Sequence, residues 1–253
     1  MIEDQNSEIY GSVVVGGGAS NLLAELYDEN AGVFSATAHG VSDDRYIGSA
    51  STHLADGTVL VTGGQTDAYF KGGSKVVGRY LNTAEVYDTS RVKFTRTAGA
   101  MTKKRRHHTA TLLQNGKVLI AGGENEDGGV SGADLYDPDK DIFTATASML
   151  EPRYKHTATL LTDGKVFLCG GANKLGSLQS CEIYDPATGL FNSTASMSVP
   201  RYDHTATLLP NGWVLVTGGE GIDSTSVEIY NPSIGGFLAS PAVGSLLNGR
   251  DGH

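Results

Sequence analysis

Four copies of the motif Arg-x-x-His place a guanidinium and an imidazole three residues apart, a pairing that could bind anions or ligate a metal. The copies are Arg105 and His108, Arg153 and His156, Arg201 and His204, and Arg250 and His253. Because the motif recurs at a regular interval, we interpret it as a structural device that ties a loop and satisfies buried backbone groups. Its histidines then lie in different repeats, and His39, His53 and His107 share no ligand spacing. We therefore predict no metal site and no cofactor.

Acid–base chemistry would require carboxylates that converge on one point. Five acidic residues belong to the segments that lead into successive repeats, and these are Asp43, Asp44, Glu151, Asp203 and Asp251. They are expected near one face of the fold, but the sequence does not show whether they meet. The acidic run from Glu124 to Asp127 lacks the ordered spacing of a cation-binding loop.

Two cysteines, Cys169 and Cys181, stand where other repeats have small residues. They lie symmetrically about Leu175 on two strands that are expected to pair. We predict two buried free thiols, with a cross-strand disulfide as the alternative. Two cysteines in a chain of this length form no disulfide framework and do not identify a compartment.

Three landmarks recur in the same order along the 253 residues. Gly-Gly pairs end at Gly18, Gly64, Gly123, Gly171 and Gly219. A tyrosine followed by Asp or Asn occurs at Tyr27, Tyr87, Tyr136, Tyr184 and Tyr230. A phenylalanine follows at Phe34, Phe94, Phe143, Phe191 and Phe237. Most of the 34 glycines are thus architectural, because they mark a repeat of about 48 residues.

Each repeat contains four short runs of β-branched or aromatic residues separated by turn residues. Asp56-Gly57, Asn115-Gly116, Asp163-Gly164 and Asn211-Gly212 predict two-residue hairpins with type I′ turns. No segment has a helical period of sufficient length. The unit is therefore a four-stranded antiparallel meander, and such units bury their faces by packing radially as a β-propeller.

The pattern Arg-x-x-His-Thr-Ala-Thr-Leu-Leu, Val-Leu-Val-x-Gly-Gly, Glu-Ile-Tyr-Asp-Pro and Phe-x-x-Thr resembles the kelch repeat. It is similar to the repeats of bacterial kelch proteins and of the propeller in galactose-oxidase-like proteins. The resemblance covers about residue 11 to residue 253 and implies an all-β, kelch-type propeller of about five four-stranded blades. It implies no copper chemistry, because neither cysteine resembles the thioether-forming cysteine of copper oxidases.

We expect one propeller domain over residues 1–253. The predicted blades are residues 3–44, 45–101, 102–149, 150–197 and 198–244, and residues 245–253 begin a further repeat. Residues 3–10 stand in the place of a first strand but have the wrong composition for one. This favours a fragment of a six- or seven-bladed ring over an irregular ring of five.

One sector departs from the repeat in both length and charge. The loop between the second and third strands of the second blade is about eleven residues longer than the others, and the next blade begins with a basic run. The candidate binding residues are Tyr69, Phe70, Lys71, Lys75, Arg79, Tyr80, Lys103, Lys104, Arg105, Arg106 and His107. Loops of these two kinds emerge on the same side of a meander, so we expect them to share one face.

The charge of this sector opposes that of the rest of the chain. Residues 66–106 carry ten basic and three acidic residues, a net charge of +7, whereas the remainder carries −16 and the whole chain −9. This predicts an acidic partner, such as a protein, a peptide or an anionic glycan, and makes nucleic acid unlikely. The bland alternative is that the charged loops are simply solvated.

The function most typical of this pattern is a kelch-type interaction module that binds a protein or another acidic ligand through one loop face. The alternative is a propeller enzyme, such as a lyase, a sugar isomerase or an oxidase-like protein, with acid–base residues at the channel mouth. No apolar run approaches the roughly 18 residues of a membrane span. The first dozen residues, with Glu3 and Asp4, lack the form of a signal peptide, and localisation is otherwise unassigned.

Overall fold

The computed structural model describes residues 12–15, 25–28, 33–36, 43, 45, 47–66, 69–71, 74–76, 78–221, 224–238 and 246–249. Within these ranges all regular secondary structure is β-strand, and no helix is present that could span a membrane. The expected all-β architecture of four-stranded antiparallel sheets is confirmed.

Five sheets of three or four strands follow one another along the described part of the chain, and we number them I to V. Sheet I has β1 (Ser12–Val15), β2 (Glu25–Asp28) and β3 (Val33–Ala36). Sheet II has β4 (Ala50–His53), β5 (Val59–Thr62), β8 (Ala84–Asp88) and β9 (Lys93–Arg96). Sheet III has β10 (Thr109–Leu112), β11 (Val118–Ala121), β14 (Ala133–Asp137) and β15 (Ile142–Ala145).

Sheets IV and V repeat the same order. Sheet IV has β16 (Thr157–Leu160), β17 (Val166–Cys169), β20 (Cys181–Asp185) and β21 (Leu190–Thr194). Sheet V has β23 (Thr205–Leu208), β24 (Val214–Thr217), β26 (Val227–Asn231) and β27 (Gly236–Phe237). Residues 3–10 and 250–253, to which the sequence assigned a defective first strand and a further repeat, lie outside the described residues.

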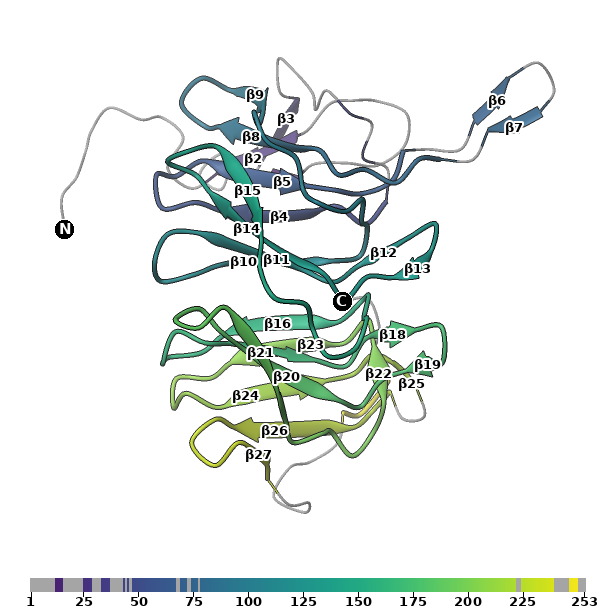
Figure 1. Ribbon diagram of the computed structural model, residues 1–253, viewed down its shortest axis with the longest axis vertical. Coiled ribbons are helices and arrows are strands. Elements are labelled where there is room, and N and C mark those ends of the chain that lie inside the picture. Colours follow the sequence, from purple (N-terminus) through teal and green to yellow (C-terminus); the bar gives the residue numbers. More distant parts are fainter. Residues whose placement is uncertain are drawn as a thin grey trace.

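Short strand pairs extend the loop between the second and third strands, which we call the 2–3 loop. Three of these pairs are hairpins within the loop: β6 (Tyr69–Lys71) with β7 (Ser74–Val76), β12 (Glu124–Asn125) with β13 (Gly128–Gly129), and β18 (Ala172–Asn173) with β19 (Gly176–Ser177). The fourth joins β25 (Glu220–Gly221), in the 2–3 loop of sheet V, to β22 (Arg201–Tyr202), in the segment that leads into β23. Figure 1 shows all four pairs on the same side of the sheets. The 2–3 loops therefore form one face, which we call the loop face.

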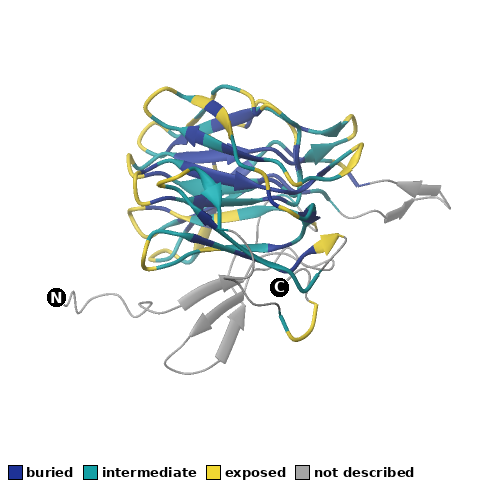
Figure 2. Cartoon of the chain, turned by 90° about the horizontal axis from the view of Figure 1, so that it is seen from below, coloured by how far each residue is buried: buried dark blue, intermediate teal, exposed yellow. Residues whose placement is uncertain are grey.

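The core lies between neighbouring sheets. Leu119 and Ala121 of sheet III pack in one cluster with Val166 and Leu168 of sheet IV, and Phe167 of sheet IV packs in the next cluster with residues of sheet V. Figure 2 shows the buried residues concentrated on the strands and the exposed residues at the turns. Burial of apolar faces between successive sheets is what a four-stranded repeat requires, because it cannot bury them alone.

The Tyr and Phe landmarks meet across the third and fourth strands of each sheet. Tyr136 pairs with Phe143 in the ladder, with ring centroids 4.7 Å apart, and Tyr184 lies 4.8 Å from Phe191 in the same way. The residue after the tyrosine begins the turn, since Asp185 Oδ1 accepts a hydrogen bond from the backbone N–H of Ala187. The interpretation of these residues as a packing aromatic and a turn starter is confirmed.

The predicted type I′ hairpins are wrong. In the turn after β10, Leu113 and Lys117 pair, the N–H of Gly116 donates to Leu113 O over 3.0 Å, and three residues form the loop. Gly116 has a φ of +80°, but Asn115 does not have a positive φ. A three-residue loop with a single left-handed residue is a turn followed by a glycine bulge. The Asx side chain helps to close it, because Asn115 Oδ1 accepts the N–H of Lys117.

Candidate functional site

In the three Arg-x-x-His motifs that the structure describes, the arginine is buried and binds the interior of its own sheet. Arg153 Nη1 donates to Gly170 O over 2.7 Å and to Ser180 O over 2.9 Å, while Nη2 lies 2.8 Å from Glu182. The same pairing recurs as Arg45 with Glu85, Arg105 with Asp134, Arg153 with Glu182, and Arg201 with Glu228. These bonds satisfy orphan carbonyls and compensate a buried charge, which confirms the structural interpretation.

Sequence reasoning missed two parts of this device. Arg45 was not recognised because Gly48, rather than a histidine, stands three residues after it. The acidic partners were not recognised because they lie 27 to 40 residues further along the chain. A sequence pattern could have identified these partners, because the second residue of the third strand is acidic in sheets II to V. Ala84-Glu85 and Cys181-Glu182 are examples.

The motif's histidines join neighbouring sheets. His156 Nε2 lies 3.1 Å from Thr109 Oγ1 of the preceding sheet, and His204 Nε2 lies 3.0 Å from Thr157 Oγ1. Burial, together with the neighbouring arginine, lowers the pKa of His156 well below 6.5 and that of His204 to about 3. Both imidazoles are therefore neutral near pH 7 and act as fixed hydrogen-bonding groups.

The Gly-Gly pairs allow the close approach that this junction needs. The N–H of Gly123 donates to Arg153 O of the next repeat over 2.8 Å. A Cβ on Gly122, whose φ is +67°, would lie 2.5 Å from that same carbonyl oxygen and 2.7 Å from His156 Cε1. No side chain fits there, so the pair is an inter-sheet contact.

The residues that stand two positions before the first strands of sheets II to V form a continuous row on the loop face. The N–H of His107 donates to Gly48 O over 2.7 Å, that of Lys155 to His107 O over 2.9 Å, and that of Asp203 to Lys155 O over 3.1 Å. We call Gly48, His107, Lys155 and Asp203 the entrance row, because each precedes the innermost strand of its sheet. All four residues have left-handed backbones, with φ between 51° and 70°.

The side chains of the entrance row differ from sheet to sheet and are only half buried. The imidazole of His107 lies over Gly48, where an added Cβ would be 3.1 Å from Nδ1. Lys155 forms an ion pair with Asp203, and its ammonium lies 5.2 Å from the centroid of the Tyr202 ring. Tyr202 donates a hydrogen bond to Glu220, which raises the pKa of Tyr202 to about 12. Burial and the nearby Arg106 charge lower the pKa of His107.

The long 2–3 loop of sheet II and the basic run that precedes sheet III meet on the loop face. The Arg106 guanidinium lies 5.2 Å from the centroid of the Tyr80 ring and donates a hydrogen bond to Gln65. It also forms a 2.9 Å ion pair with Glu124 of the next 2–3 loop. The prediction that the long loop and the basic run share one face at adjacent sheets is confirmed.

The positive charge of the sector is largely compensated within the chain. Lys104 lies 3.3 Å from Glu126 and Arg96 lies 3.1 Å from Asp43. Arg105 was a candidate binding residue, but its side chain is fully buried against Asp134 and offers no atom to a partner, so we omit it from the proposed surface. Sequence reasoning missed this compensation because each acidic partner lies 18 to 53 residues away along the chain.

Two candidate cations remain uncompensated within the described part of the chain. Arg79 and Lys103 are exposed, and neither forms an ion pair with another described residue. The candidates Tyr69, Phe70, Lys71 and Lys75 belong to the β6–β7 hairpin, in which Phe70 pairs with Lys75. Their side chains lie outside the described residues, and the backbone hairpin lies on the loop face (Figure 1).

The described carboxylates that were considered for acid–base chemistry each bind a different partner and do not form a pair with one another. Asp43 accepts a 2.5 Å hydrogen bond from Thr83, Glu151 accepts one from Ser180, and Asp203 binds Lys155. Asp44 and Asp251 lie outside the described residues. Within the described ranges, no three His, Cys, Asp or Glu side chains lie close enough together to hold a metal ion.

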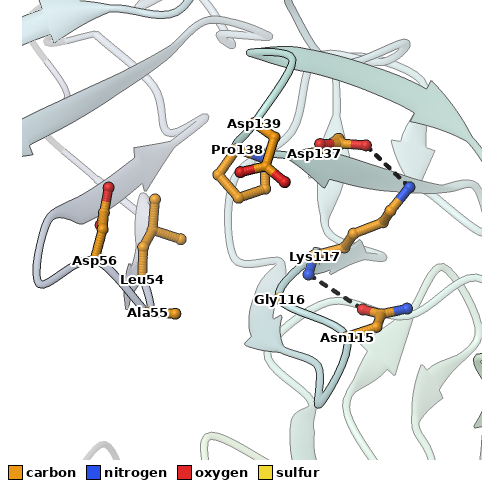
Figure 3. Close-up of a pocket in the computed structure, with 9 residues that line it drawn as sticks. All are labelled: Leu54, Ala55, Asp56, Asn115, Gly116, Lys117, Asp137, Pro138 and Asp139. Carbon is orange, nitrogen blue, oxygen red and sulfur yellow. Dashed lines mark hydrogen bonds and ion pairs between the residues drawn. The ribbon is translucent and has the colours of Figure 1, made fainter.

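A pocket of about 210 Å³ opens on the opposite side of the sheets (Figure 3). The hairpin turns at Asp56 and Asn115 and the turn at Asp137 line it, and Lys117 lies 3.0 Å from Asp137. The same turns of the next two sheets form a second pocket of about 430 Å³. Because the pocket repeats with the turns, it follows from the packing of adjacent sheets.

Comparison with known proteins agrees with this architecture. The family profile described as "Kelch motif" matches residues 153–198, which contain Arg153, His156 and the strands of sheet IV. The chain therefore contains a kelch motif and has the fold of a kelch-type β-propeller. The solved structure titled "Structure of YjhT" superimposes with a TM-score of 0.74 at 16% sequence identity, covering 95% of this chain and 83% of that one. This similarity concerns the fold. Comparison with curated proteins gave no match.

Proposed function

We propose that this kelch propeller is an interaction module that binds an acidic protein segment on its loop face. The surface consists of the entrance row, the Arg106–Tyr80 pair, Arg79, Lys103 and the β6–β7 hairpin. Kelch propellers mostly bind other proteins, and the resemblance therefore favours this class of function. The loop face also carries the two features that distinguish one repeat from another.

The entrance row is the observation that carries the proposal. A non-glycine residue in a left-handed conformation costs roughly 1 kcal/mol, and Gly48 shows that this position needs no side chain to make its backbone bonds. Three of the four described positions nevertheless carry His107, Lys155 and Asp203. The fold does not require these side chains, and strained residues of this kind cluster at binding sites.

The expected negative charge of the partner follows from the cations that form no ion pair with another described residue. Lys104 and Arg106 are compensated by Glu126 and Glu124, but Arg79 and Lys103 are not compensated by any described residue. Lys71 and Lys75 add two cations to the hairpin on the same face. An acidic segment would thus be attracted to the edge of the loop face, while the rest of this acidic chain repels it.

The test uses fluorescein-labelled synthetic peptides that are acidic, neutral or basic but of equal length, with binding measured by anisotropy. We expect the acidic peptides to bind best, with an affinity that falls as salt is added. The double variant Arg79→Glu with Lys103→Glu should weaken binding by about tenfold or more. These two positions are chosen because both residues are exposed and neither forms an ion pair with another described residue.

The matched control is Lys93→Glu. Lys93 is an exposed cation of the same sector, but it begins β9 at the opposite edge of sheet II. It should leave peptide binding unchanged. The proposal would be contradicted if acidic peptides bound no better than neutral ones, or if the control and the double variant behaved alike. If a sulfated oligosaccharide bound more tightly than every peptide, the ligand would be an anionic glycan and not an acidic protein segment.

A further inference from the structure

Cys169 and Cys181 face each other directly across two strands of sheet IV. Cys169 ends β17, Cys181 begins β20, and the ladder pairs them Cα to Cα. The adjacent pair is hydrogen-bonded, because the N–H of Gly170 donates to Ser180 O over 3.1 Å. The cysteines therefore occupy a non-hydrogen-bonded position, where opposite Cα atoms are about 4.5 Å apart and side chains are closest. That spacing lies within the range that a disulfide spans.

Both thiols are free and lie in the cluster between sheets IV and V. Their exposed fractions are 0% and 1%, and Phe167, Met197 and Val216 belong to the same cluster. The Cys181 thiol donates a hydrogen bond to Gln179 O over 3.7 Å. Burial, and next the neighbouring Cys181 thiol, raise the pKa of Cys169 well above its ordinary value. Cys169 is therefore protonated near pH 7 and reacts slowly unless the sheet opens.

The other sheets show that the fold does not need cysteine here. The corresponding pairs are Ala84 with Thr62 in sheet II, Ala133 with Ala121 in sheet III, and Val227 with Thr217 in sheet V. Small or β-branched residues thus satisfy the same packing. Only sheet IV, among those whose side chains are described, places two sulfur atoms opposite each other.

We propose that Cys169 and Cys181 are an oxidisable dithiol that closes to a disulfide when the chain meets hydrogen peroxide. One thiolate attacks a peroxide oxygen, the O–O bond breaks, and a sulfenic acid and the first water form. The second thiol then displaces the sulfenic oxygen, which leaves as a second water while the S–S bond forms. Two electrons pass from the sulfur atoms to the peroxide, and the two thiol protons end on the two waters.

The disulfide would tie the base of a 2–3 loop. The segment between the cysteines, residues 170–180, contains β18 and β19 and carries Leu175, which is 96% exposed on the loop face. Gly171 in this segment also binds Arg201 O of the next repeat over 2.9 Å. Oxidation therefore restrains one loop of the face, and this inference does not depend on which ligand that face binds.

The experiment treats the whole chain with hydrogen peroxide and maps its peptides without reduction. We expect one linkage between Cys169 and Cys181, a mass lower by two hydrogens, and a melting temperature raised by about 5 °C or more. Oxidation should be faster at pH 9 than at pH 7, because the thiolate is the reacting species. Reduction with dithiothreitol should reverse both changes.

Two single variants, Cys169→Ala and Cys181→Ala, are the controls, since alanine occupies both positions in sheet III. Both should fold and show no peroxide-induced rise in melting temperature. A second measurement refolds the chain in oxidised glutathione, where burial cannot protect the thiols. Two free thiols, or two mixed disulfides, in the refolded protein would overturn the proposal. So would an oxidised protein that melts below the reduced one.

Discussion

Arg105 and Arg106 are neighbours of the same type, as are His107 and His108, and each pair divides between two regions of the molecule. Arg105 and His108 belong to the buried repeat framework, bound to Asp134 and to Thr62. Arg106 and His107 belong to the loop face, beside Tyr80 and over Gly48. Residue type therefore does not decide the role in this protein. The position within the repeat does, because it determines which side chains the sheet encloses.

The largest expected effect concerns the glycine contact of the framework. Gly122→Ala should lower the free energy of unfolding by roughly 3 kcal/mol or more, because a Cβ there meets Arg153 O and the backbone φ is +67°. Gly116→Ala is the control, since its φ is +80° but nothing lies within 4 Å of the added atom. It should cost only about 1 kcal/mol. If the two variants lost the same unfolding free energy in urea denaturation, the close contact at Gly122 would not be the cause of the effect.

The second largest effect is expected for the adjacent residues Arg105 and Arg106, whose substitution should change the free energy of unfolding by different amounts. Arg105→Met leaves Asp134 buried without its cation, so we expect a loss of about 3–5 kcal/mol. Arg106→Met removes a partly exposed pair with Glu124 and should cost no more than about 1 kcal/mol. Chemical denaturation of both variants under the same conditions measures the difference. Similar midpoints would show that the two positions do not divide as described.

The pH dependence of stability should come from the framework histidines. Folding lowers the pKa of His108, His156 and His204, so below about pH 6.5 the unfolded chain binds more protons than the folded one. Stability should therefore fall as the pH decreases from 6.5 towards 3, by up to about 1.4 kcal/mol per pH unit for each histidine. Urea midpoints measured at pH 7.5 and at pH 5 report this slope.

The control for that prediction separates buried from exposed imidazoles. His156→Gln should lower stability at pH 7.5 but reduce the slope between pH 7.5 and pH 5. His53→Gln should leave the slope unchanged, because His53 is exposed on β4. If both substitutions changed the slope equally, the buried histidines would not be its source.

The smallest effect on stability is expected in the entrance row. His107→Gly copies Gly48 and relieves a φ of +52°, so the unfolding free energy should stay within about 1 kcal/mol of the original or rise. Binding of the acidic peptide should weaken in the same variant. His107→Val should instead destabilise the fold, because a β-branched residue resists this conformation. If the glycine variant lost stability but kept its peptide binding, His107 would have a structural role and not a binding role.

The repeat rhythm was enough to predict the strands, the sheet order and the buried role of the Arg-x-x-His motif. These features depend on local periodicity and turn residues, which the sequence records directly. The turn type was not predictable from Asn115-Gly116 alone, because the same dipeptide fits a two-residue turn and a three-residue turn with a bulge. Loop length and strand register, which tertiary pairing sets, selected the second.

The tertiary structure decided the electrostatics of the candidate site. By sequence, residues 66–106 are strongly basic and Glu124 to Asp127 form a separate acidic loop. In the folded protein Arg106 meets Glu124 and Lys104 meets Glu126, so much of the net charge disappears. Composition along the chain determined which repeats differ from the rest. Only the fold, which brings the segment before β10 beside the 2–3 loop of the same sheet, determined which charges remain free. The reason is that Coulomb interactions depend on distance in space and not along the chain.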